Sequence, residues 1–377
     1  MKIMFSTDAI KYPLTGVCRY ALELLKQLQQ SSAISELKYF NNLKVVDALP
    51  DHADKALPSS PLKEWLKKRA TLIEVYQHLY PLMQKRALRD YRDYIYHSPN
   101  YYLPAGLDRA VTTFHDISIF TCPQYHPHER VRYMHKAMQA SLKRASRVIT
   151  VSDFSRHELA NYFNYPSEKI DTTYLACSAE FYPRESAQLQ PLLTRLGLTE
   201  QGYTLFTGTI EPRKNIATLL TAYERLPQEV RMRYPLVLCG YQGWGSEEVH
   251  RRFERGQRQG WLHYLGYLPN HDLPLLFAAA RVFAFPSLYE GFGLPVLEAM
   301  ASGVPVVCSN AASLPEVAGD AASMFDPLDV DALTLALGTS LEDEHQRASA
   351  IAAGLARARQ FSWQRCAAET IEAYRKV

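Results

Sequence analysis

Two glutamates enclose a glycine-rich turn in the run Glu290-Gly-Phe-Gly-Leu-Pro-Val-Leu-Glu298. Pro295 suits the first turn of a helix, and Glu298 would lie on that same turn. Gly291 and Gly293 allow the backbone to approach a ligand. The free N–H groups and the positive end of the helix dipole would face these glycines and form an anion site. With a carboxylate on each side of the anion, the layout matches the ribose, diphosphate and hexose of a nucleotide sugar. The alternative is a capped surface helix with a solvated glutamate at each end.

A second candidate site lies upstream, in Leu205-Phe-Thr-Gly-Thr-Ile-Glu-Pro-Arg-Lys-Asn215. The pattern predicts a strand, a turn at Gly208, and then Arg213 and Lys214 at the start of a helix. Adjacent cations just past the carboxyl end of a strand suit a diphosphate. The alternative is a pair of solvated cations on a turn, which the presence of the first anion site in the same half of the chain disfavours.

Length and composition restrict the class of protein. At 377 residues the chain exceeds one hydrophobic core, so we expect two domains. Its hydrophobic content of 47%, charged content of 21% and net charge of +3 are ordinary for a globular protein and do not indicate nucleic-acid binding. No apolar run has the length of a membrane span, and an acidic residue at Asp8 comes too early for a secretory signal. The six cysteines are scattered without metal-type spacing, which favours reduced thiols and a cytoplasmic location.

Strand and helix patterns alternate twice along the chain, which predicts an α/β fold with two parallel sheets covered by helices. The predicted strands are 2–6, 109–114, 148–151, 204–206, 236–238, 263–265, 282–285 and 304–308. The predicted helices are 20–30, 130–147, 216–226, 272–280 and 295–301. The polar stretch 179–198, with Pro183 and Pro191, is interpreted as the linker between two domains.

Taken together, these motifs resemble the GT4 family of retaining glycosyltransferases, which have the GT-B fold. The resemblance is carried by 208–215 and 290–305, and it extends to 15–20, 114–116, 150–155 and 313–320. The details are most similar to mannosyl- and rhamnosyltransferases of bacterial surface polysaccharide synthesis. The resemblance implies two Rossmann-like domains facing across a cleft: residues 1–182 for the acceptor, with 361–377 packing back on them, and residues 183–360 for the nucleotide-sugar donor.

The resemblance also implies roles for individual residues. Glu298 would bind the ribose, Glu290 the donor sugar, Arg213 and Lys214 the diphosphate, and His115 would face the reacting centre. The implied catalytic positions are His115, Glu290, Arg213 and Lys214. The implied donor-binding positions are Gly16, Gly208, Arg213, Lys214, Tyr267, Leu268, Glu290, Gly291, Phe292, Gly293, Leu294 and Glu298. The chain departs from the family at Cys18, where a second glycine is common, and at Thr209, where many relatives have an arginine. A structural role in a strand-end turn is the alternative for His115.

The expected chemistry needs no metal and no cofactor. Beyond His115-Asp116 no cluster of Asp and His stands out, whereas Arg213, Lys214 and a helix N-terminus can stabilise a leaving diphosphate electrostatically. By family analogy we expect same-face substitution, with the leaving phosphate taking the proton of the acceptor. We favour a GDP-linked donor of mannose or of a 6-deoxyhexose such as rhamnose, and a glycan or lipid-linked saccharide as acceptor.

Other functions are also considered. A UDP-sugar transferase and a non-catalytic nucleotide-sugar-binding protein of the same fold are the alternatives. An NAD-dependent enzyme is disfavoured because no G-x-G-x-x-G follows the first strand.

The segment 62–92 combines many basic residues with interleaved aromatic and leucine residues. Such a helix can lie on an anionic bilayer, and the family analogy supports a peripheral position at the inner face of the cell membrane. The alternative is a helical insertion that packs its apolar stripe on the first domain. The basic residues are Lys63, Lys67, Lys68, Arg69, Lys85, Arg86, Arg89 and Arg92.

Overall fold

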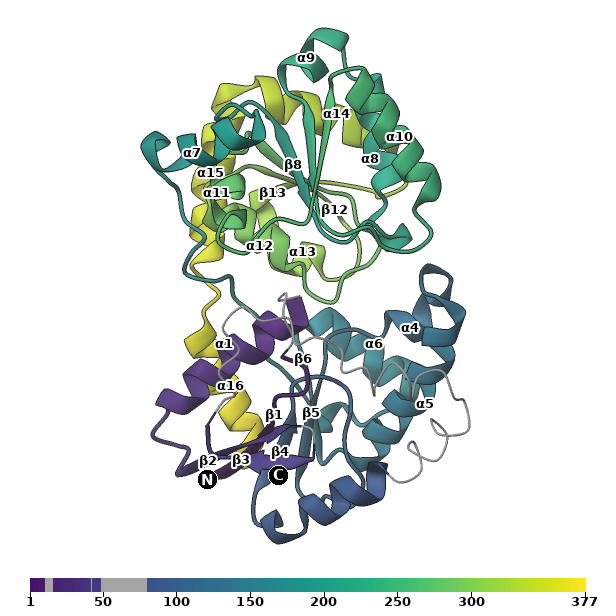
Figure 1. The fold of residues 1–377 in the computed structure, drawn as a ribbon, viewed down its shortest axis with the longest axis vertical. Coiled ribbons are helices and arrows are strands. Elements are labelled where there is room, and N and C mark those ends of the chain that lie inside the picture. Colours follow the sequence, from purple (N-terminus) through teal and green to yellow (C-terminus); the bar gives the residue numbers. More distant parts are fainter. Residues whose placement is uncertain (11–15, 42, 49–79) are drawn as a thin grey trace.

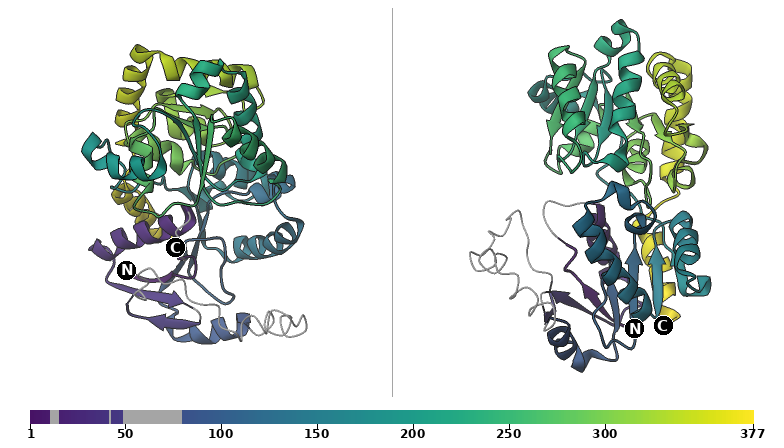
Figure 2. Two further views of the ribbon diagram at one scale, coloured as in Figure 1. Left: turned by 45° about the horizontal axis from the view of Figure 1, so that its top comes forward. Right: turned by 90° about the vertical axis from the view of Figure 1, so that its right-hand side faces the viewer.

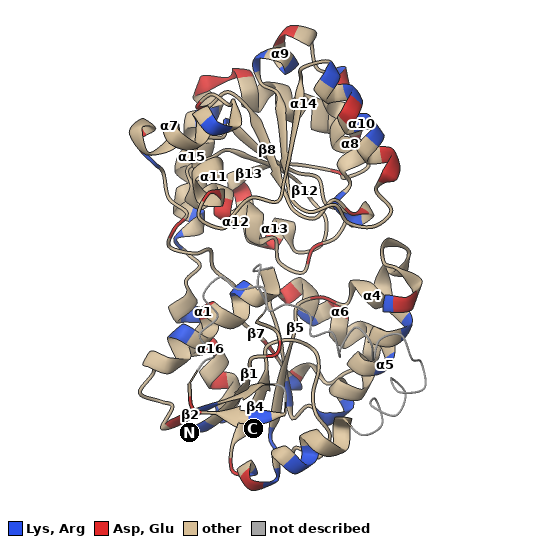
Figure 3. Ribbon diagram, in the orientation of Figure 1, with Lys and Arg blue, Asp and Glu red and all other residues tan. Residues whose placement is uncertain are grey.

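The structure, a computed structural model, describes residues 1–10, 16–41, 43–48 and 80–377. It consists of two α/β units stacked end to end (Figure 1), each built on a largely parallel sheet. This arrangement confirms the predicted fold class. Acidic and basic residues are interspersed over both units (Figure 3), in keeping with the small net charge.

The first unit contains a seven-stranded sheet in the order β3-β2-β1-β4-β5-β6-β7. All neighbouring strands are parallel except β2 and β3. Central strands such as β5 are buried along their whole length, as expected when helices cover both faces of a parallel sheet. The strands are β1 (Lys2–Ser6), β2 (Glu36–Asn41), β3 (Lys44–Val46), β4 (Ile95–Ser98), β5 (Ala110–Phe114), β6 (Arg147–Thr150) and β7 (Ile170–Thr172).

The second unit contains a six-stranded, fully parallel sheet in the order β10-β9-β8-β11-β12-β13. This is the strand order of a dinucleotide-binding Rossmann fold, and its direction of winding reverses between β8 and β11. The strands are β8 (Thr204–Thr207), β9 (Leu236–Cys239), β10 (Leu262–Gly266), β11 (Val282–Phe285), β12 (Val306–Ser309) and β13 (Ala322–Phe325).

Helices cover the sheets, and the core lies between the two layers. In the first unit they are α1 (Gly16–Gln30), α4 (Ser118–Thr121), α5 (His128–Arg144) and α6 (Asp153–Phe163). In the second unit and the C-terminal segment they are α7 (Ser186–Leu196), α8 (Ile216–Arg225), α9 (Gln228–Arg233), α10 (Glu247–Arg258), α11 (Leu273–Ala278), α12 (Leu294–Ala301), α13 (Leu314–Ala318), α14 (Val330–Glu342), α15 (Glu344–Ala358) and α16 (Trp363–Arg375). The last three form a band along one side of both units (Figure 2, right).

The chain returns to the first unit at its C-terminus. Helix α16 packs against α1 (Figure 1) and buries one face that includes Trp363 and Tyr374. The Tyr374 hydroxyl lies 2.6 Å from Nδ1 of His97 in β4, so a buried hydrogen bond ties the last helix to the first sheet. The predicted domain limits at 182/183 and 360/361 stay predictions.

Most predicted elements are present, with shifted ends, but the predicted linker is only partly correct. Residues Ser186–Leu196 form α7, which packs against α11 and buries Leu189, Leu192 and Leu193. Their spacing of three and four residues was the helical signal, and the prolines and polar residues around it obscured that signal. The predicted helix 130–147 ends earlier, at Arg144, because Arg147 already begins β6.

The segment 62–92 is described only from residue 80. Residues 80–87 are helical and Arg89–Tyr91 form a short 3-10 helix before β4, whereas 62–79 lie outside the described residues. Within the described ranges, no helix combines the length and the apolar character that spanning a bilayer requires.

Candidate active site

The candidate site lies where the strand order of the second sheet reverses. Gly208 directly follows β8, and the segment 286–290 directly follows β11, the neighbouring strand. Ligands of open α/β sheets bind outside the carboxyl ends of the strands at such a reversal. The topology therefore brings together the two motifs that the sequence keeps about eighty residues apart.

Arg213 and Lys214 both bind Glu290 in this structure. Lys214 Nζ donates to Oε1 of Glu290 at 2.6 Å, and Arg213 Nη1 donates to Oε2 at 2.9 Å. Arg213 also donates to the carbonyl oxygen of Tyr289 at 2.6 Å and, through Nη2, to Glu211 at 2.9 Å. Glu211, Lys214 and Glu290 are buried and the Arg213 side chain is 14% exposed, and the four side chains form two balanced pairs of opposite charge. The predicted sugar-binding carboxylate and the predicted diphosphate cations thus hold one another.

The charge state of Glu290 is set by these contacts. Burial by itself favours the neutral acid, but Arg213 and Lys214 outweigh it and lower the pKa of Glu290 from 4.5 to about 2. Glu290 is therefore a carboxylate at neutral pH, able to accept hydrogen bonds from hydroxyl groups.

The turn between Glu290 and α12 is pressed against the first unit. A Cβ atom at Gly291 would lie 1.9 Å from the carbonyl oxygen of His115, so only glycine fits there. The Ser152 hydroxyl donates to the carbonyl oxygen of Gly291 at 2.7 Å. Gly293 precedes α12 with a φ of 105°, which favours glycine. Phe292 is buried between them, and Leu294 begins α12.

Glu298 lies on α12 beyond its first turn, so the prediction that it belongs to the first turn is wrong by part of a turn. Its Oε1 accepts a hydrogen bond from Nη1 of Arg19, on α1 of the first unit, at 2.5 Å. Burial raises the pKa of Glu298, and Arg19 opposes this shift. The carboxylate expected to bind the ribose is thus paired with a cation from the opposite domain.

His115 follows β5 and faces the same region. Its Nε2 lies 2.9 Å from the carbonyl oxygen of Pro99, which can only accept, so Nε2 carries the proton and Nδ1 is left as an acceptor. The Tyr20 ring contacts the imidazole edge-on at 4.9 Å. Burial lowers the pKa of His115, so the ring is neutral at pH 7. A neutral imidazole with a free acceptor nitrogen suits a contact with a sugar hydroxyl.

The remaining predicted donor-site positions are Gly16, Tyr267 and Leu268. Gly16 begins α1, and a Cβ atom there would meet nothing within 4 Å. Tyr267 follows β10, stacks on Tyr241 with 4.5 Å between ring centroids, and is 38% exposed. Burial raises the pKa of Tyr267, and the positive charge of Arg19 opposes this shift. Leu268 next to it packs on the core.

Two residues that connect the domains were not assigned from the sequence. Arg19 pairs with Glu298, and the Glu316 carboxylate accepts from the backbone N–H groups of Asp153 and Phe154, at 2.7 and 3.0 Å. Glu316 thereby caps α6 from the other domain. Both residues lie inside the family-like segments 15–20 and 313–320, but their partners are more than 150 positions away and no local pattern reveals them.

The described part of the chain contains no group of three or more His, Cys, Asp and Glu side chains placed to hold a metal ion. One Asp-x-Asp triplet, a common metal motif of transferases, does occur in the sequence at 329–331. Its members have structural roles, because Asp329 caps α14 at the Ala332 N–H and Asp331 pairs with Arg225.

Comparisons with known proteins identify the relatives of this chain. Residues 195–357 match the family model for glycosyl transferases group 1, and residues 54–180 match that for glycosyltransferase family 4. The chain is 55% identical over 379 aligned residues to an O-antigen chain mannosyltransferase B of Escherichia coli, with 100% of both chains covered. It is 34% identical to a serotype-specific mannosyltransferase WbdA of Escherichia coli, over 74% of this chain and 36% of that protein.

Solved structures share the fold. The crystal structure of WaaG, a glycosyltransferase of lipopolysaccharide biosynthesis, has a TM-score of 0.70 at 15% identity and covers 98% of both chains. Anabaena HepE in complex with UDP-glucose has a TM-score of 0.74 at 18% identity over 100% of both chains. The full-length relationship at 55% identity, together with the two family models, shows that the chain is a hexosyltransferase of the GT-B fold and belongs to glycosyltransferase family 4.

Proposed function

We propose that the chain transfers mannose from GDP-mannose to a saccharide acceptor in the synthesis of an O-antigen-type polysaccharide, with retention of the anomeric configuration. The observation that supports this most is the 55% identity, over the full length, to an O-antigen chain mannosyltransferase. A transferase specific for a 6-deoxyhexose such as rhamnose has no such support.

In the proposed reaction, the bond between the sugar C1 and the β-phosphate oxygen breaks. An acceptor hydroxyl forms a new C1–O bond on the same face, and its proton passes to the leaving phosphate. The growing negative charge of GDP would be stabilised by Arg213, Lys214 and the N-terminus of α12. His115 would accept a hydrogen bond from the donor sugar at Nδ1. No residue is required as a covalent nucleophile.

Donor binding requires an exchange of partners. Glu290 holds Arg213 and Lys214 in the present structure, and Arg19 holds Glu298. In the donor complex, sugar hydroxyls would donate to Glu290 and ribose hydroxyls to Glu298. The two cations beside Glu290 could then turn toward the diphosphate.

Turnover of radiolabelled GDP-mannose on oligomannoside acceptors tests the proposal. We expect an α-linked product by NMR and activity that survives a strong chelator. Loss of activity in EDTA and its return with magnesium or manganese would refute the metal-independent mechanism. A β-linked product would refute retention. Turnover of UDP-sugars in place of GDP-mannose would favour the UDP-dependent alternative, and nucleotide-sugar binding without turnover would favour a non-catalytic binding protein.

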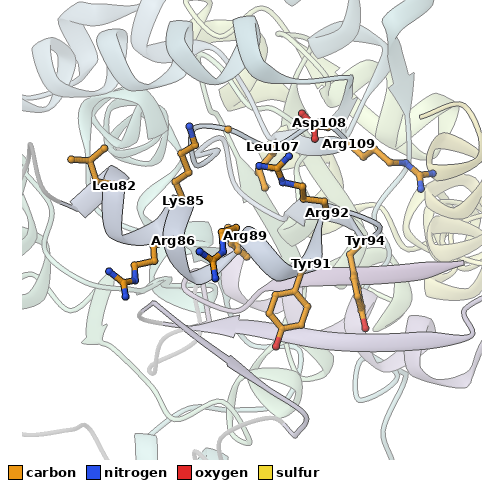
Figure 4. A pocket seen from close by; sticks show the side chains of 12 residues that line it. Leu82, Lys85, Arg86, Arg89, Tyr91, Arg92, Tyr94, Leu107, Asp108 and Arg109 are labelled. Atoms are coloured by element: carbon orange, nitrogen blue, oxygen red, sulfur yellow. The ribbon is translucent and has the colours of Figure 1, made fainter.

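We further propose that the first domain binds peripherally to an anionic membrane surface, where a lipid-linked acceptor would be found. Among the described residues, Lys85, Arg86, Arg89 and Arg92 line a pocket of about 300 Å³ together with Leu82, which is 63% exposed (Figure 4). Cations beside exposed apolar groups suit the headgroup region of a bilayer.

Vesicle sedimentation tests this membrane contact. The double substitution Arg86→Gln and Arg89→Gln should weaken binding to anionic vesicles by about 2 kcal/mol, since each cation near such a surface contributes about 1 kcal/mol. The matched control is Arg251→Gln with Arg258→Gln on α10, which removes the same charge from the second domain and should have no effect. Absence of vesicle binding by the unmodified protein at low salt would leave this segment as packing alone.

A further inference from the structure

Three tyrosine side chains, Tyr101, Tyr102 and Tyr133, gather near the carboxyl end of β4, and two of them are exposed. Tyr102 is 38% exposed and Tyr133 is 60% exposed, although large aromatic side chains contribute most when they are buried. The two rings lie 6.3 Å apart, and Tyr102 contacts Tyr101 at 4.7 Å. Tyr101 and Tyr102 follow β4, whereas Tyr133 lies on α5, so two separate elements present one row of rings.

This row begins two residues after Pro99, whose carbonyl oxygen accepts a hydrogen bond from Nε2 of His115 at 2.9 Å. The Tyr101 ring packs at 6.2 Å from Phe114, the residue directly before His115. From there the row runs through Tyr102 to Tyr133 and ends in solvent. It therefore connects the candidate donor site to the outer surface of α5.

The second domain supplies a further ring beside the row. Trp244, in the loop after β9, donates from Nε1 to the carbonyl oxygen of Tyr125 at 2.6 Å. The guanidinium of Arg130, on α5, lies 5.4 Å from the centroid of the Trp244 ring. Arg130 Nε and the Tyr101 hydroxyl both donate to the sulfur of Met134, at 3.3 and 3.8 Å. A cation and tyrosine hydroxyls thus accompany the aromatic faces along the same path.

These groups match the chemistry of a saccharide chain. A pyranose ring has an apolar face of C–H groups and hydroxyls around its edge, so it stacks on an aromatic ring while its hydroxyls bind polar neighbours. Binding sites for such amphipathic ligands combine aromatic surfaces with a few placed polar groups. A row of rings, in contrast to a single ring, suits a ligand made of successive sugar units.

We propose that Tyr101, Tyr102 and Tyr133 form an acceptor track that holds the saccharide units behind the one that receives the new sugar. This inference rests on the proposed transferase function. It specifies that the acceptor is an oligosaccharide bound over several units, and it assigns the track to the face between β4 and α5 of the first domain.

Isothermal calorimetry in the presence of GDP tests the track with two probes, methyl α-mannoside and an α-linked mannotetraose. In the unmodified protein the tetraose should bind more tightly than the single sugar. The double substitution Tyr102→Ala and Tyr133→Ala should lower the tetraose affinity on the order of tenfold. A tenfold change corresponds to about 1.4 kcal/mol, which is about half of what complete burial of an aromatic side chain contributes. The affinity for methyl α-mannoside should change little.

Two controls separate stacking from other effects. Tyr102→Phe with Tyr133→Phe keeps the rings and should retain most of the length dependence. Tyr162→Ala removes a tyrosine that is 50% exposed and whose ring contacts are with Phe120 and Phe163, and this variant should bind both probes normally. Equal affinities of the two probes for the unmodified protein, an unchanged tetraose affinity in the double Ala variant, or no binding of the tetraose would each overturn the track. Failure to bind GDP would instead refute the proposed function.

Discussion

Replacing Glu290 by glutamine gives the most direct test of how this site is built. The substitution keeps the size of the side chain and removes one negative charge. Lys214 and Arg213 then lose the carboxylate that lies 2.6 and 2.9 Å from them, while Lys214 remains buried and the Arg213 side chain remains only 14% exposed. Arg213 keeps Glu211 as a partner. The change therefore leaves one uncompensated positive charge in the interior of the second domain.

The size of the effect follows from that charge. Removing one partner of a buried ion pair costs roughly 3–5 kcal/mol. A domain of this size loses roughly 2–4 °C in melting temperature for each kcal/mol. We therefore expect Glu290→Gln to lower the melting temperature of the second domain by roughly 6–20 °C. Thermal unfolding followed by circular dichroism measures it.

The pH dependence has a defined sign. The pKa of Glu290 is lowered from 4.5 to about 2, so its ionised form stabilises the fold above pH 4.5 and this stabilisation is lost as the pH falls toward 2. The difference in melting temperature between the unmodified protein and Glu290→Gln should accordingly shrink over this range. A difference that does not change with pH would contradict the assignment to the ionised carboxylate.

Nucleotide binding provides the second measurement. In Glu290→Gln, Arg213 and Lys214 no longer bind a carboxylate. GDP should therefore raise the melting temperature of this variant more than that of the unmodified protein, because the diphosphate supplies the missing negative charge. Its turnover of GDP-mannose should nevertheless fall, since the contact with the donor sugar is lost. Glu248→Gln serves as the control, because its ion pair with Arg251 is exposed and should contribute about 1 kcal/mol or less. Normal stability together with weakened GDP binding would refute the proposed roles.

Three further predictions concern the domain interface. Glu298→Ala should weaken the binding of free GDP by roughly 1.5–3 kcal/mol, the range for a hydrogen bond to a charged group. An unchanged GDP affinity in calorimetry would show that Glu298 does not bind the ribose. His115 must be neutral to accept a hydrogen bond at Nδ1, and burial lowers its pKa, so kcat should fall with decreasing pH only below pH 6.5. This loss of kcat at low pH should disappear in His115→Asn. A loss that sets in above pH 6.5, or that persists in the variant, would contradict the assignment. Glu316→Ala removes an interdomain helix cap that contributes about 0.5–2 kcal/mol, and it should raise the KM for GDP-mannose. Glu316→Gln keeps an oxygen acceptor and should raise the KM less. Equal kinetics in both variants would refute a positioning role.

Much of the fold could be predicted from local patterns. Strands such as β1 and β11 were predicted with their observed ends, because continuous apolar runs bounded by polar residues are typical of buried parallel strands. The helix within the predicted linker was missed because the three leucines of α7 lie among prolines and polar residues. Glu298 was placed too early because the exact start of a helix is set by its cap, here Gly293, rather than by Pro295.

The sequence alone determined which chemical groups the site contains and on which side of each strand they lie. Gly208, Arg213, Lys214 and Glu290 follow the ends of two strands, and parallel strands place such residues at one edge of a sheet. The tertiary structure alone decided how these groups are paired. Glu290 binds the cations, Arg19 crosses between the domains to Glu298, and Glu316 caps α6, because charged groups that are buried must find partners wherever packing brings them, regardless of their distance along the chain.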